Sequence, residues 1–430
     1  MDFSELRLYF KRRHHIYTKI IVIFALLISL IEIGRQTYVF GNFSKIISPN
    51  LCYAIFCVTP LVLLSMTKRF TVNWILVLFC AVGGVSLLLN RPVDNHYSVV
   101  RFCFFCGMLC LLSPLVNSIH IQSFRSYLWR YVVRLVQLVV ILSIILYLKT
   151  SLFDGCGRMF MVVRHPMLLS SFAGFAAVTV SSRLLRGRNN DSVAAICFDC
   201  CSLAASLLVM IWGGSRGTIL SVGAAEIYLF IIYYDRWKKL LWLLLALAST
   251  IVIISIVGGD ATYRVKKKFE ISKANNSLIF SRKQLWESRL EEFGEKPLLG
   301  IGFTNVTRVS TLYDNKIVDV TPHRSSMEEP GSSWLSVLSN TGKAGFCIVV
   351  VWTVGLFAAV RKRRKGGDIN APLFGALLIF MAVGGLFEGW FLYAGSASFF
   401  LYWLLTSMIL DRSCPRYLIN KSLIGTWHTL

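Results

Sequence analysis

The sequence predicts an all-α polytopic membrane protein with about twelve transmembrane helices and one long outer loop that contains short amphipathic helices. Three observations support this fold class. The 430 residues are 55% hydrophobic and 13% aromatic, with a mean hydropathy of +0.62, which is too apolar for a soluble domain with one ordinary core. Long apolar runs recur along the chain, without the period-two alternation of β-barrel strands. Lys and Arg gather in every second short loop.

The apolar runs divide the chain into three parts. Several of them approach the roughly 20 residues that a helix needs to cross a bilayer: residues 20–33, 74–89, 132–148, 240–257 and 373–387. We expect about nine transmembrane helices in residues 1–257, and about three in residues 344–430 together with a cytoplasmic tail. Between them, the hydropathy falls over residues 258–343, which form the one loop long enough to fold as a unit.

The formal net charge of +23 would suit a nucleic-acid-binding protein, but the location of the charges excludes that class. If the chain changes sides at each span, the basic short loops fall on one side, as the positive-inside rule requires. These loops are residues 68–69, 119–130, 183–191, 235–239, 361–371 and the tail after 411. Both termini are therefore predicted to be cytoplasmic. The first apolar run carries Glu32 and Arg35 at its far end and is predicted to be a retained helix, not a signal peptide.

Cysteine usage predicts neither a disulfide framework nor a metal site. Most of the 12 cysteines fall inside predicted spans, where cysteine behaves as a small hydrophobe. Cys197, Cys200 and Cys201 have a C-x-x-C spacing, but no second pair or nearby histidine completes four ligands. The sequence also has no phosphate-binding glycine loop with lysine, no zinc signature and no nucleophile elbow. We therefore expect no metal and no cofactor.

The long outer loop contains two helix signals. In "SRKQLWESRLEEFGE", Ser281 and Gln284 form a capping-box pattern, and apolar residues follow on one helical face until Gly294. Such an amphipathic helix can lie on the membrane surface or cover a cavity, and the sequence leaves both open. In "EPGSSWLSVLSNTGKAGF", a turn precedes a short predicted helix over residues 333–341, which ends at Gly342 before the next span.

Arginine at the outer ends of the spans needs a reason, because an uncompensated arginine at the bilayer centre costs about 3 kcal/mol on insertion scales. In "WGGSRGTILSV", Arg216 follows a tight turn and begins a helix, and in "RHPMLLSS" Arg164 and His165 directly precede another helix. Helix N-termini favour anions, so Arg164 and Arg216 are predicted to clamp a diphosphate. The alternative for both arginines is that they snorkel to lipid headgroups.

Other charged residues near the predicted outer face extend this set. The substrate-binding candidates are Arg158, Arg164, His165, Arg216, Arg282 and Arg289. For Arg35, Arg91 and Arg158 taken singly, snorkelling or solvation is the favoured interpretation. Glu388 falls near an outer end, where it could line a cavity, whereas Asp199 falls nearer the inner side and needs an unidentified partner.

A base is needed if a sugar hydroxyl attacks an activated anomeric carbon, and the loop before residue 333 supplies candidates. The catalytic candidates are His323, Glu328 and Glu329, because an imidazole or a carboxylate can accept the proton. The alternatives are that His323 is a solvated loop residue and that the two glutamates complement the dipole of the following helix. Arginine, and not a metal, is expected to neutralise the phosphate charge.

The order of these pieces resembles the bacterial O-antigen polymerase and ligase superfamily, which are integral membrane glycosyltransferases of the GT-C type. The resemblance covers roughly residues 158–345, from "RHPMLLSS" and "WGGSRGTILSV" to the two loop segments that end in "KPLLGIGF" and "NTGKAGF". It implies a GT-C-like enzyme of the bacterial inner membrane. Such an enzyme takes a glycan from an undecaprenyl-pyrophosphate carrier at the periplasmic face, without a metal, and moves it to an acceptor.

The resemblance also implies roles for individual residues. Arg216 matches the arginine that is expected to hold the pyrophosphate, and Arg164 and His165 occupy the basic loop before a span. Ligases typically place a histidine just ahead of the final loop helix, but here that position reads Glu-Pro-Gly-Ser-Ser-Trp, and His323 lies upstream. This departure favours a polymerase of O-antigen or capsular repeat units, with one of the two loop glutamates as the base. A ligase that transfers the glycan to lipid A core is the alternative.

A transporter or flippase of lipid-linked sugars is a candidate from another class. It would place functional charges near the middle of the membrane, with broken helices and repeat symmetry. The clustering of charges at one face favours an enzyme over this class and over a structural subunit. The implied partners are an undecaprenyl-pyrophosphate-linked oligosaccharide and membrane lipids, and a chain-length regulator is a further candidate.

Overall fold

The computed structural model describes residues 3–37, 49–67, 69–90, 95–149, 162–163, 165–186, 193–234, 241, 280–303, 310–313, 316–319 and 331–411. Most of these residues are helical. The helices are α1 (Phe3–Arg35), α3 (Pro49–Ser65), α4 (Trp74–Asn90), α5 (Asn95–Leu112), α6 (Ile119–Lys149), α7 (Pro166–Arg186), α8 (Val193–Gly213), α9 (Arg216–Ile232), α12 (Phe280–Glu295), α13 (Ser333–Lys365), α14 (Ala371–Gly384) and α15 (Ala397–Leu410). Two short antiparallel strand pairs join β1 (Thr71–Val72) to β2 (Val116–Asn117) and β3 (Ser310–Tyr313) to β4 (Lys316–Asp319).

The length and composition of the helices are those of a polytopic membrane protein. Among the described residues, five helical segments are long and apolar enough to cross a membrane, and they belong to α1, α6, α7, α8 and α13. Helices α3, α4, α5, α14 and α15 are shorter and also apolar. The apolar run of residues 240–257 lies outside the described residues apart from residue 241. The total of about twelve spans, the GT-C-like arrangement and the three-part division of the chain stay predictions.

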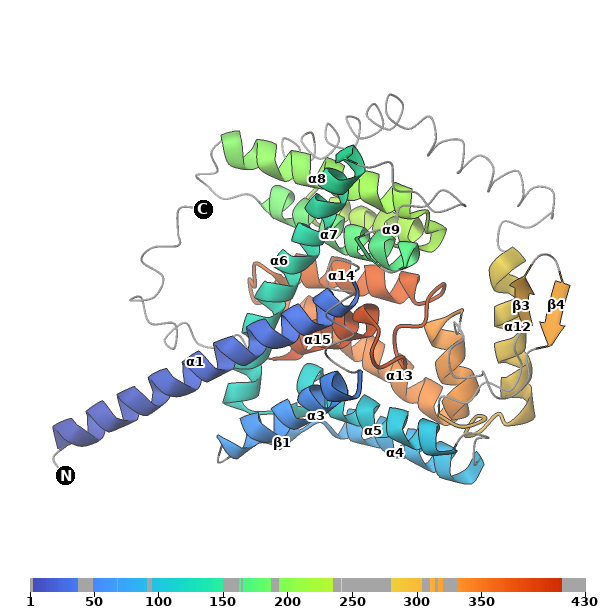
Figure 1. The fold of residues 1–430 in the computed structure, drawn as a ribbon, viewed down its shortest axis with the longest axis horizontal. Helices are drawn as coiled ribbons and strands as arrows, with labels where there is room; N and C mark the ends of the chain where they lie inside the picture. The colour runs from blue at the N-terminus through green and yellow to red at the C-terminus, as the bar shows by residue number, and fades with distance from the viewer. Residues whose placement is uncertain are drawn as a thin grey trace.

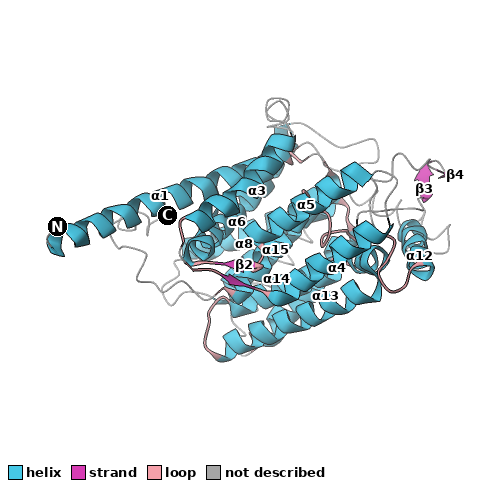
Figure 2. Ribbon diagram, turned by 90° about the horizontal axis from the view of Figure 1, so that it is seen from below, coloured by secondary structure: helices cyan, strands magenta, loops and turns pink. Residues whose placement is uncertain are grey.

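The helices form three adjacent groups (Figure 1). Helices α7, α8 and α9 pack together on one side, and α3, α4 and α5 on the other. Helices α13, α14 and α15 lie between these groups, where α14 contacts α9 and α13 contacts α4. Helix α1 packs along α6 (Figure 2). Helix α15 is the most central, because nearly every side chain from Ala397 to Ile409 is buried.

Close approach of α7, α9 and α14 depends on glycine. A Cβ atom on Gly174 of α7 would lie 2.7 Å from the Thr218 methyl group of α9 and 3.0 Å from the ring of Phe380 in α14. A Cβ atom on Gly375 of α14 would lie 2.3 Å from the hydroxyl of Tyr228. Glycine at these positions therefore lets the three helix backbones come near one another.

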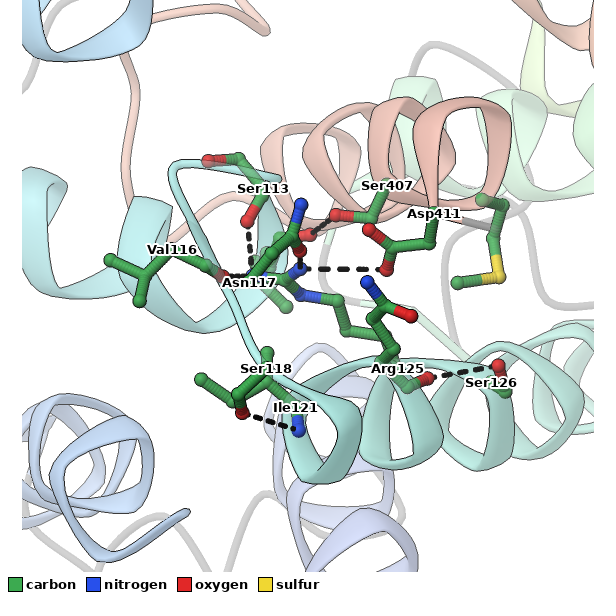
Figure 3. A network of polar contacts seen from close by, with 12 residues as sticks. Ser113, Val116, Asn117, Ser118, Ile121, Arg125, Ser126, Ser407 and Asp411 are labelled. Carbon is green, nitrogen blue, oxygen red and sulfur yellow. Dashed lines mark hydrogen bonds and ion pairs between the residues drawn. The ribbon is translucent and has the colours of Figure 1, made fainter. Parts of the chain in front are cut away.

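A fully buried arginine, Arg125, organises one end of the bundle. Figure 3 shows its polar contacts, and Figure 2 shows that β2, which takes part in them, lies at the end away from α12. The guanidinium of Arg125, near the start of α6, lies 3.4 Å from the carboxylate of Asp411, directly after α15. It also donates to the Asn117 side chain at 2.7 Å, and to main-chain carbonyls of Cys110, Leu111, Ser113 and Val116. Arg125 thus joins α5, β2, α6 and α15. We call this end of the bundle the Arg125 end.

Further polar contacts lie at the Arg125 end. Arg363, in the last turns of α13, donates to Asp368 at 2.6 Å and to the carbonyl of Ile409 at 2.9 Å, where α15 ends. Arg186 ends α7 and donates to the side chain of Asn370 at 3.1 Å, directly before α14. The ends of α7, α13 and α15 and the start of α14 are therefore fixed to one another by charged and polar side chains.

At this end, one prediction from the sequence is wrong and one open question is answered. Residues 119–130 are not a loop, because α6 begins at Ile119 and carries its basic residues as helical side chains. Asp199 of α8 pairs with Arg183 of α7, which donates through Nε at 2.9 Å. Arg183 is therefore the partner that the sequence left unidentified.

We predict that Arg125→Ala destabilises the folded protein by about 3–5 kcal/mol, because it leaves a buried carboxylate and several carbonyl groups without their donor. The measurement is the temperature at which the detergent-solubilised protein aggregates. Arg130→Ala is the matched control, since Arg130 is exposed on the same helix and lies over the ring of Tyr127 at 5.1 Å. Equal melting temperatures for the two variants would contradict the role of Arg125.

Candidate functional site

The predicted break in the chain at Gly342 is present, and it divides α13 into a short helix and a span. Gly342 has φ 65° and ψ −165°, a conformation that residues with a side chain rarely adopt. The short helix begins at Ser333, after the N-cap residue Ser332, whose hydroxyl accepts from the amide of Leu335. The sequence predicted this short helix and its end because glycine follows a turn signal and nine helix-compatible residues.

The start of the short helix is hydrogen-bonded to the non-helical segment that joins α14 to α15, residues 385–396. The Ser333 amide donates to the carbonyl of Gly385 at 2.7 Å. The Ser333 hydroxyl donates to the carbonyl of Glu388 at 2.6 Å and accepts from the amide of Trp390 at 2.5 Å. One serine therefore fixes the backbone on both sides of residue 389.

The amphipathic helix α12 packs on the short helix of α13. Its buried face carries an ion pair in which Arg289 lies 2.9 Å from Glu292, with side chains 4% and 0% exposed. Glu292 also accepts from the Ser339 hydroxyl of the short helix at 2.5 Å. The indole of Trp286 donates to the carbonyl of Gly331 at 3.3 Å. Helix α12 is thus fixed to the turn before the short helix and to Ser339 within it, whereas the choice between a membrane-surface helix and a cavity cover stays open.

The segment after α12 supports the break at Gly342. The amides of Lys343 and Ala344 donate to the carbonyls of Pro297 at 2.8 Å and Leu298 at 3.2 Å. Asn90, the last residue of α4, donates from its side chain to the carbonyl of Gly300 at 2.9 Å. The amides that the break leaves without helical partners are thereby paired with this segment. The hydroxyl of Ser86 in α4 donates to the carbonyl of Asn340, next to the break, at 2.8 Å.

Arg216 is the first residue of α9 and has an exposed side chain. The preceding Ser215 caps the helix, because its hydroxyl accepts from the amide of Thr218 at 3.3 Å. A Cβ atom on Gly217 would lie 2.7 Å from Cβ of Phe387, so the first turn of α9 touches the 385–396 segment. Arg216 precedes Gly217 and Glu388 follows Phe387 in the chain, so the two residues flank this contact between α9 and the 385–396 segment.

Arg282 of α12 also reaches the 385–396 segment. Its guanidinium lies 3.2 Å from the Glu388 carboxylate, and both side chains are 14% exposed. The rings of Trp286 and Phe387 lie 6.1 Å apart, so α12 also packs against the 385–396 segment. Three elements that are distant in sequence therefore meet here. We call Arg216, Arg282 and Glu388 the arginine site, and this end of the bundle the α12 end.

The other end of the 385–396 segment is held by a second ion pair. Arg35 of α1 lies 2.9 Å from Glu32, which is fully buried, and also donates to the carbonyl of Gly395. This corrects the interpretation of Arg35 as a solvated or snorkelling residue. The pair instead joins α1 to the segment that carries Glu388.

The candidate residues derived from the sequence do not all lie at the arginine site. His165 is exposed directly before α7, and the nearby hydroxyl of Ser170 donates to the carbonyl of Met210 at 2.8 Å, which ties α7 to the end of α8. Arg282 pairs with Glu388. Arg216 begins α9 next to Gly217, which contacts the same 385–396 segment. Arg289 instead faces Glu292 in the packing of α12. The candidates outside the described residues are Arg91, Arg158, Arg164, His323, Glu328 and Glu329.

Glu388 was noted in the sequence as a charge near an outer end that could line a cavity, but it was not among the substrate-binding or catalytic candidates. Its signal was a single carboxylate within the apolar stretch "GGLFEGWFLY" near the outer end of a predicted span. The contact with Arg282 links residues 106 positions apart, and no local pattern predicts such a contact. In the described part of the chain, no three His, Cys, Asp or Glu side chains are grouped so as to hold a metal ion.

The comparison with protein families applies to the part of the chain that builds this site. Residues 201–350 match the family described as O-antigen ligase. This match confirms the resemblance to the O-antigen polymerase and ligase superfamily. The matched residues include α9 with Arg216, α12 with Arg282 and the short helix of α13. No curated protein matches the chain.

The family match supports a glycosyltransferase-like activity of the O-antigen ligase or polymerase type, with lipid-linked sugars as substrates in general. It does not distinguish a polymerase from a ligase. The match ends before residues 385–396. Glu388 therefore enters the site through the fold alone.

We predict that Ser333→Ala loosens residues 385–396, because it removes two hydrogen bonds of roughly 1 kcal/mol each. Hydrogen–deuterium exchange of the full chain in detergent measures this, and the amides of residues 388–390 should exchange about tenfold faster. Ser126→Ala is the control, since its hydroxyl donates only to the carbonyl of Gln122 in the same helix. Unchanged exchange in Ser333→Ala would show that the serine does not hold the segment.

Proposed function

We propose that the chain polymerises undecaprenyl-pyrophosphate-linked O-antigen or capsular repeat units at the periplasmic face of the bacterial inner membrane. The observation that carries this proposal is that α9, which begins at Arg216, and α12, through Arg282, both contact the 385–396 segment at one end of the bundle. Both helices lie within the residues that match the O-antigen ligase family. Paired guanidiniums on separate rigid elements suit a diphosphate, because each can bind phosphate oxygens in a bidentate manner.

The proposed orientation follows from the distribution of basic residues. Helix α13 ends in Lys362, Arg363, Arg364 and Lys365, at the end opposite the short helix and α12. Because basic residues concentrate on the cytoplasmic side, the Arg125 end is assigned to the cytoplasm and the α12 end to the periplasm. Both termini are then cytoplasmic. This orientation gives the arginine site access to periplasmic sugars and to the headgroup of the carrier.

The proposed reaction is glycosyl transfer without a metal. A hydroxyl of the acceptor repeat unit bonds to the anomeric carbon, and the bond from that carbon to the phosphate oxygen breaks. Undecaprenyl pyrophosphate leaves with the electron pair, and Arg216 and Arg282 stabilise the negative charge that develops on it. Fixed guanidiniums are effective here because they do not have to reorganise during the reaction.

Other candidates take supporting roles in this proposal. His165 directly precedes α7, and it would bind the sugar or the phosphate together with Arg158 and Arg164, which lie outside the described residues. The proton of the attacking hydroxyl would pass to His323, Glu328 or Glu329, which precede Gly331 and the Trp286 contact in the chain. Arg289, through its ion pair with Glu292, would hold α12 in place. A chain-length regulator is a proposed partner.

A ligase that transfers the glycan to lipid A core is the second candidate, because the matching family is described as O-antigen ligase. Deletion of the gene separates the two activities. Loss of a polymerase leaves lipid A core that carries a single repeat unit, whereas loss of a ligase leaves polymer on its carrier. We predict the first pattern on gels of surface glycan, and an unchanged glycan profile would contradict both candidates.

We predict that Arg216→Ala reduces chain extension by about 100-fold or more, because it removes one stabilising charge from the leaving pyrophosphate. The measurement is the length distribution of the glycan after complementation of the deletion strain, at equal protein abundance in the membrane. Arg361→Ala is the matched control, since Arg361 is an exposed arginine at the Arg125 end. Normal chain length with Arg216→Ala would exclude a role of Arg216 in the reaction.

A further inference from the structure

Glu388 is held in the arginine site by its backbone as well as by its side chain. Its carbonyl accepts from the Ser333 hydroxyl at 2.6 Å, and the same hydroxyl accepts from the amide of Trp390. The preceding Phe387 packs against Gly217 and Trp286. The position of the carboxylate is therefore set by α9, α12 and α13 together, which is more support than a solvated surface glutamate needs.

The charge of Glu388 opposes the function proposed for its neighbours. A site that binds pyrophosphate gains from guanidiniums and loses from a carboxylate at hydrogen-bond distance, since like charges repel. Glu388 nevertheless lies 3.2 Å from the Arg282 guanidinium, and both side chains are 14% exposed. At this exposure the pair is partly desolvated, but it is open enough for another anion to reach Arg282.

We propose that Glu388 is an exchangeable counter-ion of Arg282, which the pyrophosphate of the incoming carrier displaces and which returns when the product leaves. The inference rests on the proposed function, because it takes the ligand of Arg282 to be a pyrophosphate. In the empty site, the carboxylate offsets part of the cost of a partly buried guanidinium. In the loaded site, the pyrophosphate takes over the guanidinium, because it offers more charge and more acceptor oxygens than one carboxylate.

This exchange has a consequence for selectivity and for release. An anion must outcompete Glu388, so singly charged anions gain little from Arg282, whereas a pyrophosphate with several charged oxygens gains much. The carboxylate near the bound product also weakens the hold on undecaprenyl pyrophosphate after the sugar has left. Glu388 is thus a specificity-determining residue of the site, distinct from the base that accepts the hydroxyl proton.

Binding of inorganic pyrophosphate to the purified full chain in nanodiscs tests the inference, with titration calorimetry as the readout. We predict that Glu388→Gln binds pyrophosphate about tenfold more tightly than the unaltered protein, and that Arg282→Gln binds it more weakly. In the double variant, the gain from Glu388→Gln should fall below about twofold, because the counter-ion acts through Arg282. Inorganic phosphate should show a smaller gain than pyrophosphate.

Glu287→Gln is the matched control, because it removes the same charge from an exposed pair with Lys283 on α12, at 3.6 Å. It should leave pyrophosphate binding unchanged. Glu388→Asp provides a second variant that keeps the charge and shortens the side chain. Its affinity for pyrophosphate should lie between those of the unaltered protein and Glu388→Gln. If Glu388→Gln does not fold, an affinity of Glu388→Asp equal to that of the unaltered protein would overturn the inference.

Weaker or unchanged pyrophosphate binding by a folded Glu388→Gln protein would contradict the exchange and indicate a purely structural pair. If Glu388→Gln raised the pyrophosphate affinity equally with and without the Arg282→Gln substitution, the exchange would also be contradicted. In that case Glu388 would act by general charge repulsion of pyrophosphate, which does not depend on Arg282. Failure of the proposed function gives a different result. In that case glycan chain length does not respond to Arg216→Ala in cells, whatever the effect of Glu388 on pyrophosphate binding in the purified protein.

Discussion

Two interruptions of helix, at Gly342 and over residues 385–396, lie within the α12 end of the bundle, and each needs partners for its backbone amides and carbonyls. Unpaired backbone groups in an apolar bundle cost free energy comparable to a lost hydrogen bond. Pro297 and Leu298 supply the partners at Gly342, and Ser333 supplies them around Glu388. Because these partners come from different parts of the chain, satisfying them fixes α12, the short helix and the 385–396 segment relative to one another. The arginine site is a product of this constraint.

Buried charged side chains, like the interrupted backbone, are supplied with partners at both ends of the bundle. At the Arg125 end, Arg125 and Arg363 bind carboxylates and the carbonyls at helix ends, so their charge stabilises the fold. At the α12 end, Arg289 and Arg35 are paired in the same way. Arg216 differs, because its side chain is exposed at the N-terminus of α9, whose first turn contacts the 385–396 segment. The distinction between buried pairs and this more accessible group separates structural arginines from the candidate functional ones.

Much of the fold, and part of the candidate site, could be predicted from the sequence where the signal is local. Hydropathy indicated the helices, the capping pattern indicated α12, and the glycine after "SWLSVLSNT" indicated the end of the short helix. Arg216 was found because charge is rare beside apolar runs. The pairing of Arg282 with Glu388 and the burial of Arg289 could not be found, because they depend on which helices become neighbours. The extent of α6 was missed because basic residues at a membrane surface look alike in a loop and in a helix.

The central claim is that Arg216 and Arg282 together bind the pyrophosphate of a lipid carrier. An electron cryomicroscopy structure of the full chain in nanodiscs with undecaprenyl pyrophosphate tests this claim most directly. The account predicts phosphate density between the two guanidiniums, with the Glu388 carboxylate moved away from Arg282. Phosphate density elsewhere, with Arg282 and Glu388 still paired at 3.2 Å, would contradict it.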